Sequence, residues 1–230
     1  MKVKSSIIQN KFIRVQTLNY GASLFEIYHK KKKINLILNL GSKENYRYKH
    51  PSVGSTCGRY AGRISNSKFK IANKKFILSS NEGKNILHGG KVGFSYYPWK
   101  KLKQTKDKII YQLHSRDNDQ GFPGNLIVSC TYQIRNKYLI IKYEYKSDKS
   151  THVNLTNHSY WNLEKNKKKM IYNHDLKLNS HKYLQINKYL IPTGVFKKVK
   201  NSIYDFLSFE NIGKKLNYFK KKKLNAKFKG

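Results

Sequence analysis

Cysteine is rare in this chain: only Cys57 and Cys130 occur among its 230 residues. Two cysteines are too few for the disulfide framework of a small secreted domain. The N-terminus lacks the apolar core and small-residue cleavage site of a signal peptide, and no apolar run approaches the roughly 18 residues of a membrane span. The sequence therefore predicts a cytoplasmic protein with reduced thiols and no membrane partner.

Acidic residues are also scarce, with 12 Asp and Glu against 48 Lys and Arg, which gives a formal net charge of +36. Such a charge suggests binding to nucleic acid, because cations that neutralise phosphates release counterions. Only six of the 48 are Arg, however, although Arg suits phosphate and guanine recognition best. Lys, Asn, Ile, Tyr and Phe all have codons rich in A and T, so compositional drift explains the excess. We expect no specific nucleic-acid partner, and a basic nucleic-acid-associated protein remains an alternative supported by charge alone.

The sequence contains no long amphipathic helix, but short stretches of alternating polarity are frequent. With 38% hydrophobic and 13% aromatic residues, the chain can bury a folded core. Alternation is clearest over residues 126–145, where it predicts a hairpin that turns at residues 135–137. Further short strands are expected at residues 35–40, 69–78, 109–114 and 153–163. These strands predict an all-β fold, a large antiparallel β-sandwich.

No internal repeat or linker divides the sequence into domains. We therefore expect one β-sandwich over residues 1–210. From residue 211 the chain is rich in Lys and has few spaced apolar residues. This composition predicts a frayed tail over residues 211–230.

Three segments carry residues suited to chemistry. His88 ends a predicted strand and precedes two glycines, which let a ligand approach the backbone closely. His158 lies in a polar segment with Trp161, whose ring can stack on a sugar. Arg63 follows a second Arg four positions earlier, in a chain that otherwise uses Lys. Each has a structural alternative: a turn residue for His88, a core histidine for His158 and an ion pair for Arg63.

In this order, the segments resemble the aldose 1-epimerase family, also called the galactose mutarotase family. The matching pieces are GASLFEIY at 21–28, GRYAGRI at 58–64, NEGKNILHGG at 81–90, DNDQGFPGNL at 117–126, VNLTNHSYWNL at 153–163, IPTG at 191–194 and YDF at 204–206. The resemblance implies a two-layer antiparallel β-sandwich. It also implies a cytosolic isomerase without a cofactor or metal, which interconverts the α and β anomers of a hexose such as galactose or glucose.

The resemblance also implies roles for individual residues. Mutarotation needs one group that removes the proton of the C1 hydroxyl and another that protonates the ring oxygen. His158 matches the family's general acid, and an imidazole can give and regain a proton near neutral pH. His88 would hydrogen-bond the same region of the sugar. Arg63 and Asp205 would hold ring hydroxyls, and Trp161 would stack on the ring.

The sequence departs from the family pattern at two points. Gly62 stands where the family usually has Asn, which removes one side-chain hydrogen bond. No Glu matches the family's C-terminal general base, and Glu164 has the pattern of a strand end rather than of that base. We therefore expect a sandwich that lacks its last strands and an impaired epimerase, with the general base unknown. The alternative is a non-catalytic sugar-binding remnant.

Overall fold

The computed structural model describes residues 2–221 of the chain. The fold divides after Trp161 into two compact units, residues 1–161 and 162–230, and each is described by itself. From the sequence we expect the boundary near residue 210. The structure divides earlier because the strands that follow Trp161 pair only with one another.

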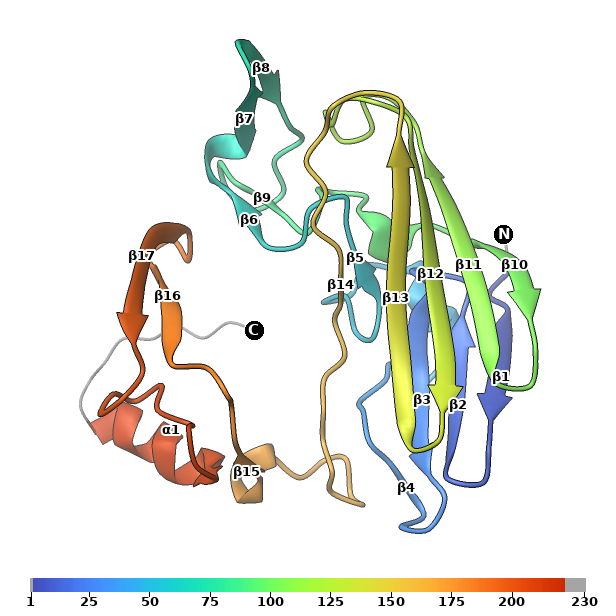
Figure 1. Cartoon of the computed structure of the whole chain (residues 1–230), viewed down its shortest axis with the longest axis vertical. Coiled ribbons are helices and arrows are strands. Elements are labelled where there is room, and N and C mark those ends of the chain that lie inside the picture. The colour runs from blue at the N-terminus through green and yellow to red at the C-terminus, as the bar shows by residue number, and fades with distance from the viewer. Residues whose placement is uncertain (1, 222–230) are drawn as a thin grey trace. The chain divides into compact units, whose positions relative to one another are not determined.

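Two four-stranded antiparallel sheets dominate the first unit (Figure 1). The first sheet, drawn in blue, has the order β1-β2-β3-β4, with β1 (Ser5–Gln9), β2 (Ile13–Leu18), β3 (Ser23–His29) and β4 (Ile34–Asn35). The second, drawn in green to yellow, has the order β10-β11-β12-β13, with β10 (Lys100–Gln104), β11 (Lys108–Ser115), β12 (Leu126–Arg135) and β13 (Tyr138–Ser147). Neighbouring strands within each sheet follow one another in the chain, so both sheets are meanders.

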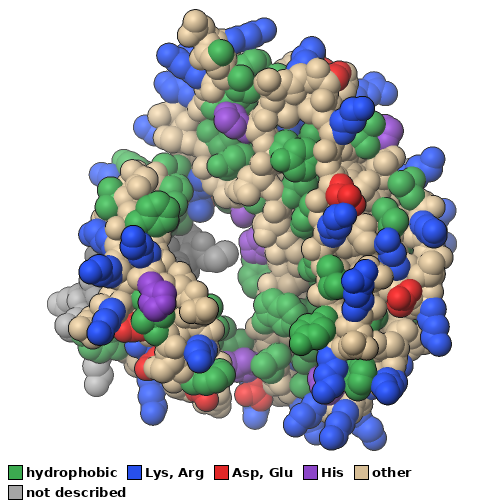
Figure 2. All heavy atoms as spheres, in the orientation of Figure 1, with side chains coloured by type: hydrophobic (Ala, Val, Ile, Leu, Met, Phe, Trp, Pro, Cys, Tyr) green, Lys and Arg blue, Asp and Glu red, His purple; other side chains and the backbone are tan. Residues whose placement is uncertain are grey.

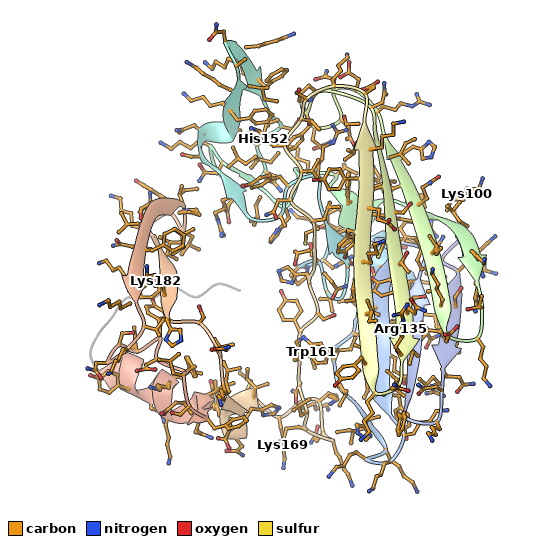
Figure 3. All side chains as sticks on the ribbon, viewed as in Figure 1. Lys100, Arg135, His152, Trp161, Lys169 and Lys182 are labelled. Carbon is orange, nitrogen blue, oxygen red and sulfur yellow. The ribbon has the colours of Figure 1, made fainter. Side chains whose placement is uncertain are left out.

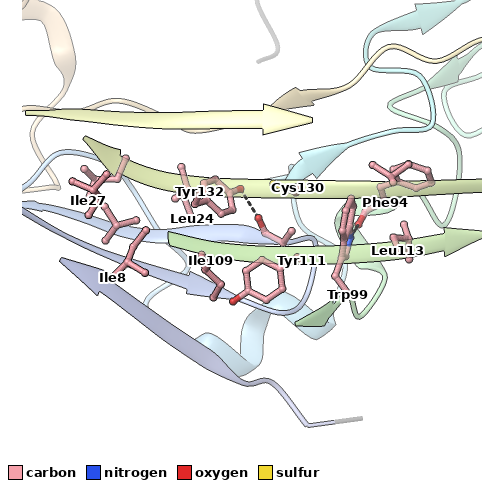
Figure 4. Packing of buried hydrophobic residues seen from close by; sticks show 14 of the residues in the cluster. Ile8, Leu24, Ile27, Phe94, Trp99, Ile109, Tyr111, Leu113, Cys130 and Tyr132 are labelled. Carbon is pink, nitrogen blue, oxygen red and sulfur yellow. Dashed lines mark hydrogen bonds between the residues drawn. The ribbon is translucent and has the colours of Figure 1, made fainter. Parts of the chain in front are cut away.

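The core of the first unit lies between these two sheets (Figure 4). Ile8, Leu24 and Ile27 from the first sheet belong to the same buried cluster as Ile109 and Tyr132 from the second. The Tyr132 hydroxyl also donates a hydrogen bond of 2.5 Å to the backbone carbonyl of Ala22 across the two layers. The first unit is therefore a β-sandwich whose layers share one apolar core.

The predicted hairpin is confirmed by β12 and β13, which pair in register from Leu126↔Ser147 to Arg135↔Tyr138. The turn between them contains Asn136 at a φ of 51°, a left-handed conformation that Asn tolerates better than most residues. The alternating side chains of β12 enter the core from Leu126 to Ile134. Strand β13 continues that face, and Leu139, Ile141 and Tyr143 pack against the core.

Three short two-stranded ladders complete the strands of the first unit. They pair β5 (Thr56–Cys57) with β14 (Thr156–Asn157), β6 (Arg63–Ile64) with β9 (Ile86–Leu87), and β7 (Lys68–Ile71) with β8 (Lys74–Ile77). Strands β7 and β8 form a hairpin where the sequence analysis expects one strand over residues 69–78. The chain reverses at Ala72, whose φ is 48°. The first unit also contains 3₁₀ turns at Lys43–Arg47, Ser65–Ser67 and Phe94–Tyr96.

The second unit consists of two small antiparallel ladders and one helix. It pairs β15 (Asp175–Leu176) with β18 (Glu210–Asn211) and β16 (Lys182–Ile186) with β17 (Pro192–Lys198), and it contains a 3₁₀ turn at Ile171–Asn173 and α1 (Ile212–Lys221). Within the part of the chain that the structure describes, no helix is long and apolar enough to cross a membrane.

Helix α1 occupies residues for which the sequence analysis expects a frayed tail. The Asn211 side chain accepts a hydrogen bond from the Lys214 backbone N–H, as an N-cap residue does. Ile212 and Leu216 stand four residues apart, on the same face of the helix. Gly213 packs closely on Tyr172, where a β-carbon would lie 2.7 Å from the Tyr172 carbonyl oxygen. Residues 222–230 of the predicted tail lie outside the described residues.

Candidate active site

The structure brings His88 and His158 together, although 69 residues separate them. Their ring centroids are 5.2 Å apart, and the rings meet edge to face at 82°. His88 directly follows β9, and His158 directly follows β14. Two short ladders of the first unit therefore position the two imidazoles next to each other.

The backbone of His158 is bonded on both sides to the segment that enters β5. The His158 N–H donates to the Ser55 carbonyl at 2.9 Å, and the Gly54 N–H donates to the His158 carbonyl at 2.9 Å. The side-chain amide of Asn157 adds a third bond to the Gly54 carbonyl at 2.8 Å. These bonds leave the backbone at His158 little freedom, so the position of its imidazole is set by the sandwich.

His88 is held through a reciprocal pair of bonds with Gly62. The His88 N–H donates to the Gly62 carbonyl at 3.0 Å, and the Gly62 N–H donates to Nδ1 of His88 at 3.1 Å. The next residue must be glycine, because a β-carbon on Gly89 would lie 1.8 Å from the Gly58 carbonyl oxygen. A β-carbon built on Gly62 would have no other atom within 4 Å. Gly62 contacts His88 through its backbone.

These contacts define the protonation state of His88. Burial, together with the charges of His158 and Arg63, lowers the pKa of His88 to about 4. The ring is therefore neutral at neutral pH. Since Nδ1 accepts the bond from Gly62, the single ring proton lies on Nε2. His88 presents a neutral N–H donor beside His158.

Arg63 forms a two-pronged ion pair with Glu82. Its Nε donates to Oε2 of Glu82 at 2.5 Å, and its Nη2 donates to Oε1 at 2.7 Å. The Arg63 side chain is 18% exposed and that of Glu82 is 39% exposed. The ion pair considered for Arg63 in the sequence analysis is thus present, and it occupies one edge of the guanidinium.

The other Arg of the segment GRYAGRI has a structural role. Arg59 is buried, and its guanidinium donates to the carbonyls of Pro123 and Gly124 at 2.8 and 2.9 Å and to the Ser115 hydroxyl at 2.6 Å. These bonds tie the segment DNDQGFPGNL to the rest of the first unit. A planar fork with several donors is needed for this, which explains why Lys does not replace it.

Two aromatic side chains follow His158. The Tyr160 ring lies 5.1 Å from the His158 ring, centroid to centroid, and its hydroxyl donates to the Pro51 carbonyl at 3.2 Å. Trp161 forms an isolated backbone bridge with Ile37 and leaves 56% of its surface exposed (Figure 3). An exposed indole can stack on a ligand, which is the role that the sequence analysis predicts for Trp161.

Asp205 belongs to the second unit, where it organises its own turn. Its Oδ2 accepts the Asn201 N–H at 2.9 Å, and its Oδ1 accepts the Leu207 N–H at 3.3 Å. These backbone hydrogen bonds lower the pKa of Asp205 and keep it ionised. Its contact with a sugar beside the two histidines stays a prediction.

Residues 2–221 contain no group of three or more His, Cys, Asp or Glu side chains placed to hold a metal ion. Cys57 and Cys130 are free and buried. Burial raises the pKa of both thiols, to about 12 in Cys130.

Comparison with known proteins identifies the family of the chain. A family model described as aldose 1-epimerase matches residues 4–230. The chain belongs to the aldose 1-epimerase family. It is 38% identical over 200 residues to the aldose 1-epimerase of Haemophilus influenzae, covering 84% of this chain and 58% of that protein. It is 31% identical over 215 residues to the galactose mutarotase of Homo sapiens, covering 92% of this chain and 63% of that protein. The chain thus spans about three fifths of the length of these curated relatives.

Solved structures agree with the assignment to the aldose 1-epimerase family. An aldose epimerase homologue from C. elegans superposes with a TM-score of 0.87 at 27% identity, covering 93% of this chain and 66% of that chain. A galactose 1-epimerase from Lactobacillus acidophilus gives a TM-score of 0.81 at 28% identity, covering 94% and 69%. The predicted β-sandwich of the galactose mutarotase type is therefore confirmed.

Some neighbours of the histidines in this aldose 1-epimerase family member are absent from the sequence analysis. Glu82 was not recognised as the partner of Arg63, because the two are 19 residues apart and neither position has a distinctive spacing. Tyr160 is one of two aromatic residues next to His158 in the sequence, but its contact with the imidazole could not be predicted from that position. Both belong to segments that carry the family resemblance, so the resemblance was the one available signal.

Proposed function

We propose that this chain binds a hexose such as galactose or glucose at the His88–His158 pair. The site belongs to a reaction that interconverts the α and β anomers of the sugar. The observation that carries the proposal is the neutral Nε2–H donor of His88 beside the imidazole of His158. The names of the relatives, aldose 1-epimerase and galactose mutarotase, support the class of reaction. The free thiols of Cys57 and Cys130 are compatible with a cytoplasmic location.

The reaction opens and closes the sugar ring. His158 donates a proton to the ring oxygen while a solvent water molecule takes the proton of the C1 hydroxyl. The bond between C1 and the ring oxygen then breaks, and C1 becomes an aldehyde. Rotation about the bond between C1 and C2 then presents the other face of the aldehyde, and ring closure returns the proton to His158. His88 donates a hydrogen bond from Nε2 to the same region without changing its own protonation. Two imidazoles in different environments can thus hold different roles.

The remaining predicted residues bind the sugar rather than move protons. Arg63 donates to ring hydroxyls from the edge of its guanidinium that Glu82 leaves free. The exposed face of Trp161 stacks on the apolar face of the ring. A neutral hexose with several hydroxyl groups fits this mixture of donors, acceptors and an aromatic platform.

The general base is the catalytic role for which the residues of this chain give the least support. No Glu matches the family's base motif, and Glu82, whose charge acts on His88, is bound by Arg63. We therefore propose that the chain binds a hexose and turns it over slowly. Removing a positioned general base typically lowers a rate by about 10²–10⁴-fold.

Nuclear magnetic resonance of the histidine side chains tests sugar binding. Titration with galactose should shift the imidazole signals of His88 and His158 together, with one dissociation constant. His114 is the control, because it is exposed on β11 and hydrogen-bonds Gln112. Unchanged signals of His88 and His158 at saturating sugar would contradict the proposal, as would equal shifts of all three histidines.

A further inference from the structure

The Arg63–Glu82 ion pair stands directly beside His88 in the first unit. Arg63 begins β6 and pairs with Leu87, the residue before His88. Glu82 comes from the turn that leads into β9, and the backbones of Glu82 and Asn85 exchange hydrogen bonds of 3.1 and 3.0 Å. Both members of the pair are therefore fixed by backbone bonds around one ladder. The fold thus places the carboxylate of Glu82 and the guanidinium of Arg63 within reach of each other.

The pair divides the donors of Arg63 into two sets. Glu82 takes the N–H of Nε and one N–H of Nη2. The other three N–H groups have no hydrogen-bond partner among residues 2–221. A guanidinium held along one edge keeps its plane fixed, so its remaining donors meet a ligand without first losing rotamer freedom.

The pair also balances charge next to His88. The Arg63 charge lowers the pKa of His88, and the Glu82 charge raises it. A neutral sugar is a poor match for an isolated cation, which attracts anions and water instead. With Glu82 in place, Arg63 keeps its directional donors while its charge is compensated.

The stability that this ion pair contributes is limited by its exposure to solvent. Glu82 is 39% exposed, and ion pairs that solvent reaches contribute little to the stability of a fold. The chain offers a comparison in Arg14 and Glu26, which form the same two-pronged pair across β2 and β3 at 3.0 and 3.1 Å. The two pairs differ in their surroundings. The Arg14–Glu26 pair lies on strands of the first sheet, whereas the Arg63–Glu82 pair lies next to His88.

We propose that Glu82 is a positioning residue for sugar binding, which holds the guanidinium of Arg63 so that its free edge faces the hexose. The proposal rests on the proposed function, because it assumes that a hexose binds beside His88. Glu82 itself does not touch the sugar or transfer a proton. It acts through the orientation and charge of Arg63.

The test compares Glu82→Gln with the matched control Glu26→Gln in the full chain. Glu82→Gln removes the charge and one acceptor of the pair, so the dissociation constant for galactose should rise about tenfold. Glu26→Gln makes the same chemical change in the pair on β2 and β3, and it should leave the dissociation constant unchanged. An unchanged constant in Glu82→Gln, or an equal rise in both variants, would overturn the proposal.

The titration of His88 separates a positioning role from loss of structure. In a folded Glu82→Gln variant the pKa of His88 should fall below about 4, because a carboxylate that raises it is gone. Unfolding would instead move the pKa of His88 up, toward its ordinary value of 6.5.

If Glu82→Gln unfolds, Glu82→Asp decides, because it keeps the charge and shortens the reach to Arg63 by one methylene. Weaker galactose binding by this variant supports the proposal, and wild-type affinity overturns it. Failure of the wild-type chain to bind galactose would overturn both this proposal and the proposed function. Binding by the wild type without any effect at Glu82 would overturn this proposal alone.

Discussion

At the scale of single residues, His88 and His158 differ in how the protein holds their rings. The Nδ1 of His88 accepts a backbone N–H, and burial lowers its pKa to about 4. His158 is fixed through its backbone instead, by bonds to Ser55 and Gly54. The two imidazoles, 5.2 Å apart, thus lie in different environments, as the proposed roles of a neutral donor and a proton carrier require.

The lowered pKa of His88 predicts a dependence of stability on pH. A histidine whose pKa is lower in the folded state binds protons more readily when unfolded. Its contribution is therefore fully present above pH 6.5 and is lost as the pH falls toward 4. Between pH 7 and pH 5, the wild type should lose on the order of 1 kcal/mol more unfolding free energy than His88→Gln, since solvent at the ring screens part of the effect.

Urea unfolding of both proteins at the two pH values measures this difference. Buried His50, whose pKa burial also lowers to about 4, contributes equally to both proteins and cancels in the comparison. An identical loss of stability in wild type and His88→Gln would show that His88 is not held neutral by the fold.

At the scale of elements, the segment NEGKNILHGG is a loop closed by its first residue. The Asn81 side chain accepts the Leu87 N–H at 2.7 Å and donates to the carbonyls of Leu87 and Gly90 at 3.0 Å each. His88 lies between these two anchor points at a φ of 51°. The three bonds keep the backbone in a conformation that a histidine rarely adopts by itself.

Replacing Asn81 by Ala should release this loop. We expect a loss of about 1–2 kcal/mol of unfolding free energy, because backbone groups lose their partners. Amide exchange at Leu87 should become faster, and the His88 signal should shift or broaden. Asn39→Ala is the matched control: Asn39 bonds the Phe25 carbonyl and the Gly41 N–H in another turn. Amide exchange at Leu87 as slow in Asn81→Ala as in the wild type would contradict this role.

Strands with a sustained alternation of polar and apolar residues could be predicted from the sequence. Elements that depend on pairing with another part of the chain could not. The β12–β13 hairpin was recognisable because ten residues of each strand alternate. Strands β1 to β3 have the same geometry, but a bulge between Gln16 and Thr17 interrupts the register. Helix α1 was missed because its Lys-rich composition hides an Asn cap and a short apolar face.

The candidate site, too, could be predicted only in part from the sequence. Each histidine could be found from its neighbours in the sequence, and their order along the chain carried the family resemblance. The Arg63–Glu82 pair could not be found from the sequence, because it depends on the register of β6 against β9. The role of Gly62 was also hidden, since its backbone and not a side chain bonds His88.

At the scale of the whole molecule, the net charge of +36 is spread over the surface. Figure 2 shows Lys and Arg side chains scattered over the visible face among other side chains, with few acidic groups between them. A scattered charge attracts polyanions without a defined geometry, and such attraction falls with added salt. The charge therefore indicates nonspecific attraction of polyanions and does not locate a binding site.

The central proposal is that this chain binds a hexose at the His88–His158 pair and interconverts its anomers slowly. Polarimetry of freshly dissolved α-galactose measures it most directly, in a sample whose galactose binding has been established by the His88 and His158 signals. The account predicts bound sugar and a mutarotation rate close to the spontaneous rate in buffer. Rapid turnover that is abolished by His158→Ala would contradict it, because a general base would then be at work in the chain.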